Sequence, residues 1–120
     1  MNNVKFNYLY RDAGNYKKWG KVVFSNPNKL TLEWMTKNLQ QAFSQECLFN
    51  AGQIRIPECF LFAKGHATTD DHCFHEFDTV ELSLESPSDL HSRSMDQFIG
   101  EIKREAMRGW IAFDSDEVTV

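Results

Sequence analysis

The stretch that decides the fold is Val4-Lys5-Phe6-Asn7-Tyr8-Leu9-Tyr10-Arg11. Apolar or aromatic side chains recur at every second position from Val4 to Tyr10, while Lys5 and Asn7 have the opposite parity. A period of two predicts a half-buried β-strand, because successive side chains of a strand point to opposite faces. We therefore expect this stretch to be a strand with one face in the core.

A turn and a second strand are expected next. Residues 12–15, Asp-Ala-Gly-Asn, form turns readily, and Gly14 and Asn15 can adopt positive φ. A second strand is expected over about 18–25, and the Ser-Asn-Pro-Asn run at 25–28 ends it. Two strands joined by a short turn predict an antiparallel hairpin.

Two amphipathic helices are expected further along the chain. Thr31 can cap the first, over about 32–45, and Ser94 can cap the second, with Gln97 in the capping-box position and Gly109 as terminator. The apolar stripe of the first helix is Leu32, Met35, Leu39, Ala42 and Phe43. The stripe of the second is Met95, Phe98, Ile99, Ile102 and Ala106. Both stripes have the helical spacing of a buried face.

The segment between the helices is expected to hold further strands. The runs at 47–49 and 58–63 are strand-like, and another strand is expected over 75–84. The alternation shifts within this last run: His75 and Phe77 have one parity, and Val80, Leu82 and Leu84 have the other. A bulge near residues 78–79 would bring both sets onto one face.

The order strand-strand-helix-strand-strand-helix predicts an α+β fold, in which an antiparallel sheet has two helices packed on one face. We expect residues 1–120 to form a single globular domain. Trp34 lies off the apolar stripe of the first helix, so we expect it either to pack beside the hairpin or to be exposed.

Composition excludes several classes of protein. The chain has 120 residues, of which 42% are hydrophobic and 13% aromatic, so it can form a core and is not disordered. No apolar run approaches the roughly 20 residues that span a bilayer. The three cysteines, Cys47, Cys59 and Cys73, are widely spaced and do not indicate a disulfide framework. We expect a cytoplasmic protein with no membrane association.

Charge is distributed unevenly along the chain, whose net charge is −4. Residues 1–64 carry nine basic and four acidic side chains, and residues 65–120 carry four basic and thirteen acidic ones. This asymmetry predicts either two electrostatic faces or a fold in which the halves interleave and their charges pair. The acidic balance argues against direct nucleic-acid binding.

The segment at 66–78 concentrates groups that could bind a metal or react. It holds three of the four histidines and Cys73 among acidic residues. His72, Cys73 and His75 are candidate zinc ligands, although their spacing matches no zinc knuckle. Alternatively, Cys73 could be a nucleophile with His72 or His75 as its base. Neighbouring carboxylates would raise the pKa of the thiol, which argues against this role.

We favour a structural interpretation of the same segment. Asp70 and Asp71 can accept backbone N–H groups in a turn. Phe74 or Phe77 would then anchor the following strand in the core. We accordingly expect neither a metal nor a cofactor.

The hairpin is the second candidate site. Its candidate ligand-binding residues are Tyr8, Tyr10, Arg11, Asp12, Asn15, Tyr16 and Lys17. Aromatic planes, an arginine fork and a lysine suit a flat or phosphate-bearing anion such as a nucleotide. The same residues are also ordinary parts of a hairpin with an Arg–Asp pair across its turn. No Gly-rich phosphate loop or hydrolase motif accompanies them.

The chain resembles a family of small bacterial proteins to which no activity is assigned. The resemblance lies in Tyr8-Leu9-Tyr10-Arg11-Asp12-Ala13-Gly14-Asn15-Tyr16-Lys17, in Ile56-Pro57, and in Asp70-Asp71-His72-Cys73 with the following Glu76. Family members have a YLYRDA-x-NYK start and a DDHC-type turn. This chain differs in having Gly14 where a serine is usual and in lacking a Gly-Leu after Pro57. The resemblance implies a bacterial, phage or other mobile-element setting, and it assigns no catalytic residue.

These observations predict a non-catalytic accessory protein of mobile-element origin that acts through a protein partner, for example as a counter-defence factor or inhibitor. Its acidic second half would suit a basic partner surface. One alternative is a protein that binds a small nucleotide-like anion through the hairpin. A less favoured alternative is a small metal- or thiol-dependent hydrolase.

Overall fold

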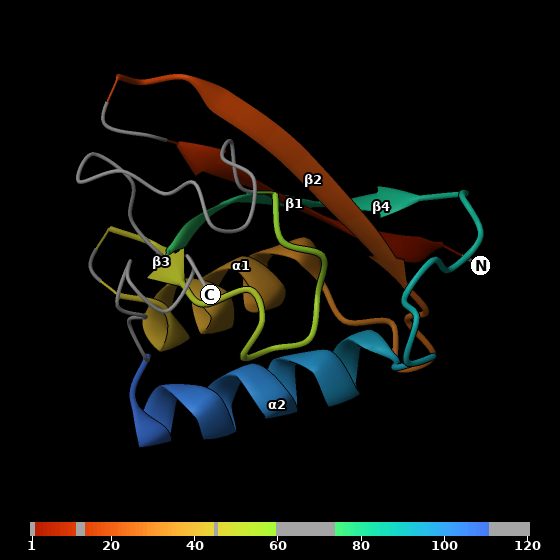
Figure 1. The fold of residues 1–120 in the computed structure, drawn as a ribbon. Helices are drawn as coiled ribbons and strands as arrows, with labels where there is room; N and C mark the ends of the chain where they lie inside the picture. The colour runs from red at the N-terminus through yellow and green to blue at the C-terminus, as the bar shows by residue number, and fades with distance from the viewer. Residues whose placement is uncertain (1, 12–13, 45, 60–73, 111–120) are drawn as a thin grey trace.

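The computed structural model describes residues 2–11, 14–44, 46–59 and 74–110. Four antiparallel strands form one sheet in the order β2-β1-β4-β3, and both helices lie on the same face of it (Figure 1). The elements are β1 (Asn3–Arg11), β2 (Lys17–Phe24), α1 (Leu32–Ala42), β3 (Leu48–Phe49), β4 (His75–Ser83) and α2 (Met95–Arg108). The predicted α+β fold and element order are confirmed.

The hairpin of β1 and β2 forms as its sequence predicts. The two strands pair antiparallel, with Val4 opposite Phe24 at one end and Arg11 opposite Lys17 at the other. In the turn, Asn15 has a φ of 65°, which is the left-handed conformation expected of it. β1 is therefore a central strand, flanked by β2 and β4.

The predicted bulge lies in β4. Asn7 is opposite Thr79 and Tyr8 is opposite Phe77, so Asp78 is the extra residue. The bulge lets three inner side chains enter the core: His75, Phe77 and Val80. Leu82 and Leu84, which we expected on the same face, are exposed. Leu82 borders an open hollow of about 500 Å³, and Leu84 lies beyond the end of β4 at Ser83.

The core is aromatic and centres on Phe6 of β1. Its ring centroid lies 5.2–6.4 Å from those of Tyr8, Phe43, Phe49, Phe77 and Phe98. The helices add Met35, Leu39, Met95, Ile99 and Ile102. The side of the sheet that carries Phe6 is therefore the inner face, and the side turned away from α1 and α2 is called the outer face below.

α1 begins where its sequence predicts and ends earlier. The Thr31 hydroxyl oxygen accepts the N–H of Trp34 at 3.2 Å, which caps the helix. The predicted end at residue 45 is wrong, because Phe43 takes an extended backbone and stacks on Phe49 with a centroid distance of 4.8 Å. Trp34 is 43% exposed, and Lys103 of α2 places its Nζ 5.3 Å from the indole centroid.

α2 has the predicted capping at both ends. Ser94 Oγ accepts the N–H of Gln97 and Gln97 Oε1 accepts the N–H of Ser94, which completes a capping box. Gly109 ends the helix with a φ of 97°, a conformation that favours glycine.

The strands expected between the helices form only in part. β3 has two residues, and Glu58 and Cys59 lie outside any strand. The rest of the predicted run at 58–63, the turn at Asp70 and Asp71, and the chain after Trp110 lie outside the described residues. Within the part that is described, no helix is long and apolar enough to cross a membrane.

Candidate binding surface

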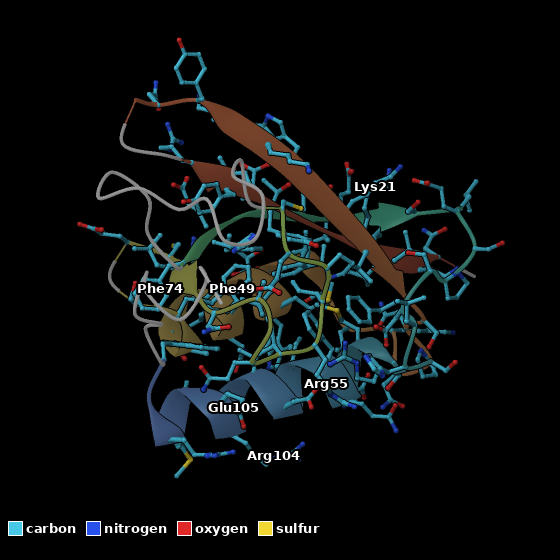
Figure 2. The ribbon with its side chains drawn as sticks, viewed as in Figure 1. Lys21, Phe49, Arg55, Phe74, Arg104 and Glu105 are labelled. Carbon is cyan, nitrogen blue, oxygen red and sulfur yellow. The ribbon has the colours of Figure 1, made fainter. Side chains whose placement is uncertain are left out.

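The outer face of the β1–β2 hairpin carries polar residues from both strands. Its members are Lys5, Asn7, Leu9 and Arg11 from β1, and Lys17, Trp19, Lys21 and Val23 from β2. They share this face because they have the parity opposite to that of Phe6. Figure 2 shows Lys21 on the side of the sheet away from the helices. Four of the eight are basic, which makes the hairpin the cationic part of this face.

Trp19 is the exposed aromatic group of the surface. It is 57% exposed, whereas Leu9, its partner in the register, is 1% exposed. Lys17 and Lys21 stand two residues away on either side of Trp19, on the same face. Tryptophan is enriched among the residues that contribute most to protein interfaces.

Arg11 is already engaged within the chain. Its Nε donates to Glu76 Oε1 at 3.3 Å and its Nη2 to Glu76 Oε2 at 3.2 Å, while Nη1 donates to Asn15 Oδ1. This fork-shaped contact ties β1 to β4 and to the turn. The guanidinium that the sequence suggested for an anionic ligand thus has a structural partner.

Tyr8 and Tyr10 lie in the core and not beside Arg11. Both are fully buried, and the Tyr8 hydroxyl donates to the backbone oxygen of Pro57 at 2.6 Å. Burial raises the pKa of this hydroxyl. The Tyr10 ring lies 5.4 Å from the His75 ring. Neither tyrosine therefore offers a plane to a ligand on the surface.

The structure accordingly divides the predicted ligand-binding set. Tyr8 and Tyr10 are on the inner face, and Arg11 and Lys17 are opposite each other on the outer face. Tyr16 is exposed just before the start of β2. Asn15, in the turn, accepts a hydrogen bond from Arg11. Asp12 lies outside the described residues. The expected cluster of aromatic planes around the arginine is not formed, because strand alternation separates them.

His75 has a structural environment as well. It is fully buried, and its Nε2 accepts the backbone N–H of Cys59 at 2.8 Å. Burial also raises the pKa of the Cys59 thiol. No three His, Cys, Asp or Glu side chains in the described part of the chain are grouped so as to hold a metal. His72 and Cys73 lie outside that part, so their roles as ligand or nucleophile stay predictions.

The basic and acidic halves of the sequence interleave in the fold. Among the residues that the structure describes, five ion pairs join them: Lys5–Glu81, Lys5–Glu85, Arg11–Glu76, Lys21–Glu85 and Arg55–Glu101. Hydrogen bonds from Lys5 and Lys21 lower the pKa of Glu85 to about 2. Of the two interpretations of the charge asymmetry, the pairing of the halves is the one that the structure shows.

The pairing leaves some cations of β2 without a carboxylate partner in the described part of the chain. Lys17 and Lys18 form no ion pair with any described residue. Lys18, Trp19 and Lys21 were not among the residues that the sequence singled out. The run Lys17-Lys18-Trp19-Gly20-Lys21 could have indicated them. In a strand, Trp19 lies on the same face as Lys17 and Lys21, so an apolar side chain stands between two lysines.

A second hollow lies beside α2. It has a volume of about 620 Å³, and Figure 2 shows two of its lining residues, Arg55 on the segment after β3 and Arg104 on α2. Asp96 and Glu101 line it as well, and Arg55 is paired with Glu101 at 2.8 Å. Its charges are therefore mixed.

Comparison of the chain with protein-family models, with curated proteins and with solved structures gives no match. The likeness to the YLYRDA-x-NYK family accordingly stays a prediction.

Proposed function

We propose that this chain is a non-catalytic binding protein that acts through a protein partner, and that the outer face around Trp19 is its contact surface. The observation that carries the proposal is the position of Trp19. It is more than half exposed, between Lys17 and Lys21, on the face of the sheet opposite to α1 and α2.

Trp19 leaves apolar area in contact with water, which a partner could cover. A buried aromatic side chain removes about 150–250 Å² from solvent. At about 25 cal/mol per Å², covering the exposed part of this indole would contribute about 2–4 kcal/mol to an interface. Strand pairing with β1 already fixes the backbone of Trp19, so a partner that covers the residue has mainly its side chain to order.

The small-anion alternative has less support from the geometry. The tyrosine rings that would stack on a nucleotide are in the core, and Arg11 is bound to Glu76 and Asn15. The proposed counter-defence or inhibitor role, and the mobile-element origin, rest on the resemblance of sequence and stay predictions.

The proposal is tested by affinity capture from a lysate of the source organism, at low and high salt, followed by binding of the purified partner. Trp19→Ala is compared with Trp34→Ala, a matched control on α1 whose indole is 43% exposed. We expect a partner that binds the wild type and Trp34→Ala, and binds Trp19→Ala at least tenfold more weakly. Capture without any partner, or equal binding by both variants, would contradict the proposal. Thermal shifts with nucleotides but no protein partner would favour the alternative.

A further inference from the structure

β2 is an edge strand, and described residues cover its edge away from β1 at one end only. Ser88 donates its N–H to Val23 O at 2.9 Å, and its Oγ accepts the N–H of Val23 at 2.9 Å. Val23 therefore points its backbone groups away from β1. Residues of the same parity do so too, because in an antiparallel strand both backbone groups of a residue face the same neighbour. These residues are Lys21, Trp19 and Lys17.

No described segment pairs with the rest of this edge. Among the residues that the structure describes, none bonds to the outward N–H and C=O groups of Trp19 and Lys21. Ser88 thus covers the edge at Val23, and the free part of the edge consists of the outward-facing backbone groups of Lys21 and Trp19. An open edge is a template for another strand.

We propose that the free edge of β2 binds an extended acidic segment of the partner protein as an additional strand. This inference rests on the proposed function and specifies the kind of partner segment. Main-chain hydrogen bonds to Trp19 and Lys21 would hold the segment, and side chains on the outer face would select it.

Charge determines which segment fits. Lys17, Lys18 and Lys21 lie within five residues of β2, and the first two have no ion-pair partner in the described chain. A second copy pairing antiparallel about Trp19 would place Lys17 of one chain against Lys21 of the other. Like charges directly opposite each other destabilise a sheet. The edge therefore disfavours its own copy and favours a strand with carboxylates.

The register gives the pattern of that strand. Added residues opposite Lys21, Trp19 and Lys17 would project on the outer face, at every second position. The complementary partner segment has an acidic residue opposite Lys21, an apolar residue opposite Trp19 and an acidic residue opposite Lys17, with one residue between each pair. Cross-strand pairs of opposite charge and of apolar with aromatic groups are the favourable ones.

A hollow at the end of the free edge specifies one more residue of the partner segment. It has a volume of about 360 Å³ and is bordered by Val22 of β2 and by Ser88. Its apolar lining residues are Val22, Ile56, Pro57 and Leu90. The added residue opposite Val22 would project on the inner face toward this hollow. For an antiparallel strand the motif is therefore apolar-acidic-x-apolar-x-acidic.

The test uses a labelled ten-residue peptide that contains Leu-Glu-Thr-Val-Thr-Glu, with binding followed by fluorescence anisotropy. One control peptide has lysine in place of both glutamates. Another carries an N-methyl group on the residue opposite Trp19, which removes a main-chain hydrogen bond without changing any side chain. We expect the lysine and N-methyl peptides, and added salt, each to weaken binding at least tenfold.

Protein variants provide the matching controls. Lys17→Glu should weaken peptide binding at least tenfold, and Lys37→Glu, the same charge change at an exposed position of α1, should not. Binding of the N-methyl peptide as tightly as the parent, or binding that Lys17→Glu leaves unchanged, would overturn strand addition. A partner that depends on Trp19 but is not displaced by the peptide would overturn this inference alone. Absence of both partner and peptide binding would overturn the proposed function as well.

Discussion

Replacement of Arg93 by methionine should destabilise the protein strongly, because Arg93 is a buried cation with several partners. The residue is 6% exposed, and its Nε and Nη2 donate to the two carboxylate oxygens of Asp89, each at 2.9 Å. Its guanidinium also donates to the backbone oxygens of Ile54 and Arg55 at 2.8 and 3.0 Å, and to Glu101. Arg93→Met would leave the buried Asp89 without its cation.

The expected loss is about 3–5 kcal/mol of unfolding free energy, the usual effect of removing one member of a buried ion pair. It is measured by urea unfolding at pH 7. Arg55→Met is the matched control, because Arg55 also pairs with Glu101 but is half exposed. An exposed pair contributes about 0–1 kcal/mol. A loss under about 1 kcal/mol for Arg93→Met, or equal losses for both variants, would refute the argument.

The pH dependence gives a second test of the same contact. Burial alone would raise the pKa of Asp89, but hydrogen bonds from Arg93 hold it below its ordinary value. In the wild type this carboxylate therefore stabilises the fold above the unfolded pKa of about 3.9, and the effect is lost as the pH falls below it. In Arg93→Met, burial should raise the pKa of Asp89, so stability is lost as the pH rises. The difference in unfolding free energy between the wild type and Arg93→Met should therefore become smaller from pH 7 to pH 4. A difference that does not change with pH would contradict this explanation.

Two glycines give opposite predictions, both measured by thermal and urea unfolding. Gly20→Ala should destabilise the protein by about 1–3 kcal/mol, because the added Cβ would lie 2.7 Å from Cys59 Sγ and from Tyr8 Cζ. An unchanged unfolding midpoint would show that these groups move aside freely. Gly100→Ala should stabilise α2 by about 0.5–1 kcal/mol, because no atom lies within 4 Å of its added Cβ. A lower melting temperature for Gly100→Ala would contradict the helical-propensity argument.

Local patterns in the sequence predicted the fold because they act within a few residues. The alternation of β1, the caps at Thr31 and Ser94, and the parity shift that marks the Asp78 bulge all have short-range causes. The end of α1 did not follow from its pattern. Phe43 has helical spacing, but its ring packs on Phe6 of β1 and Phe49 of β3, which lie outside the helix, and these contacts favour its extended backbone.

The candidate site was harder to predict than the fold. Grouping the hairpin residues by chemical type placed Tyr8 and Tyr10 with Arg11, although the alternation of β1 already assigns them to opposite faces. Asp89 is a local partner of Arg93, four residues earlier, but the other partners of Arg93 are distant in the sequence: the backbone of Ile54 and Arg55 and the side chain of Glu101. Contacts of this range depend on the packing of the segment after β3 against α2.

The sign of the charge on a partner cannot be taken from the net charge of −4 or from the acidic second half of the chain. Glu76, Glu81 and Glu85 are paired with bases from the first half, so an incoming surface meets little of their charge. At physiological salt, charges separated by more than about 8 Å are largely screened. A strand added to β2 would lie about 5 Å from it, and so would be influenced mainly by the lysines of that edge. Although the whole chain is acidic, the charge at β2 is basic, and it favours a partner segment that is acidic.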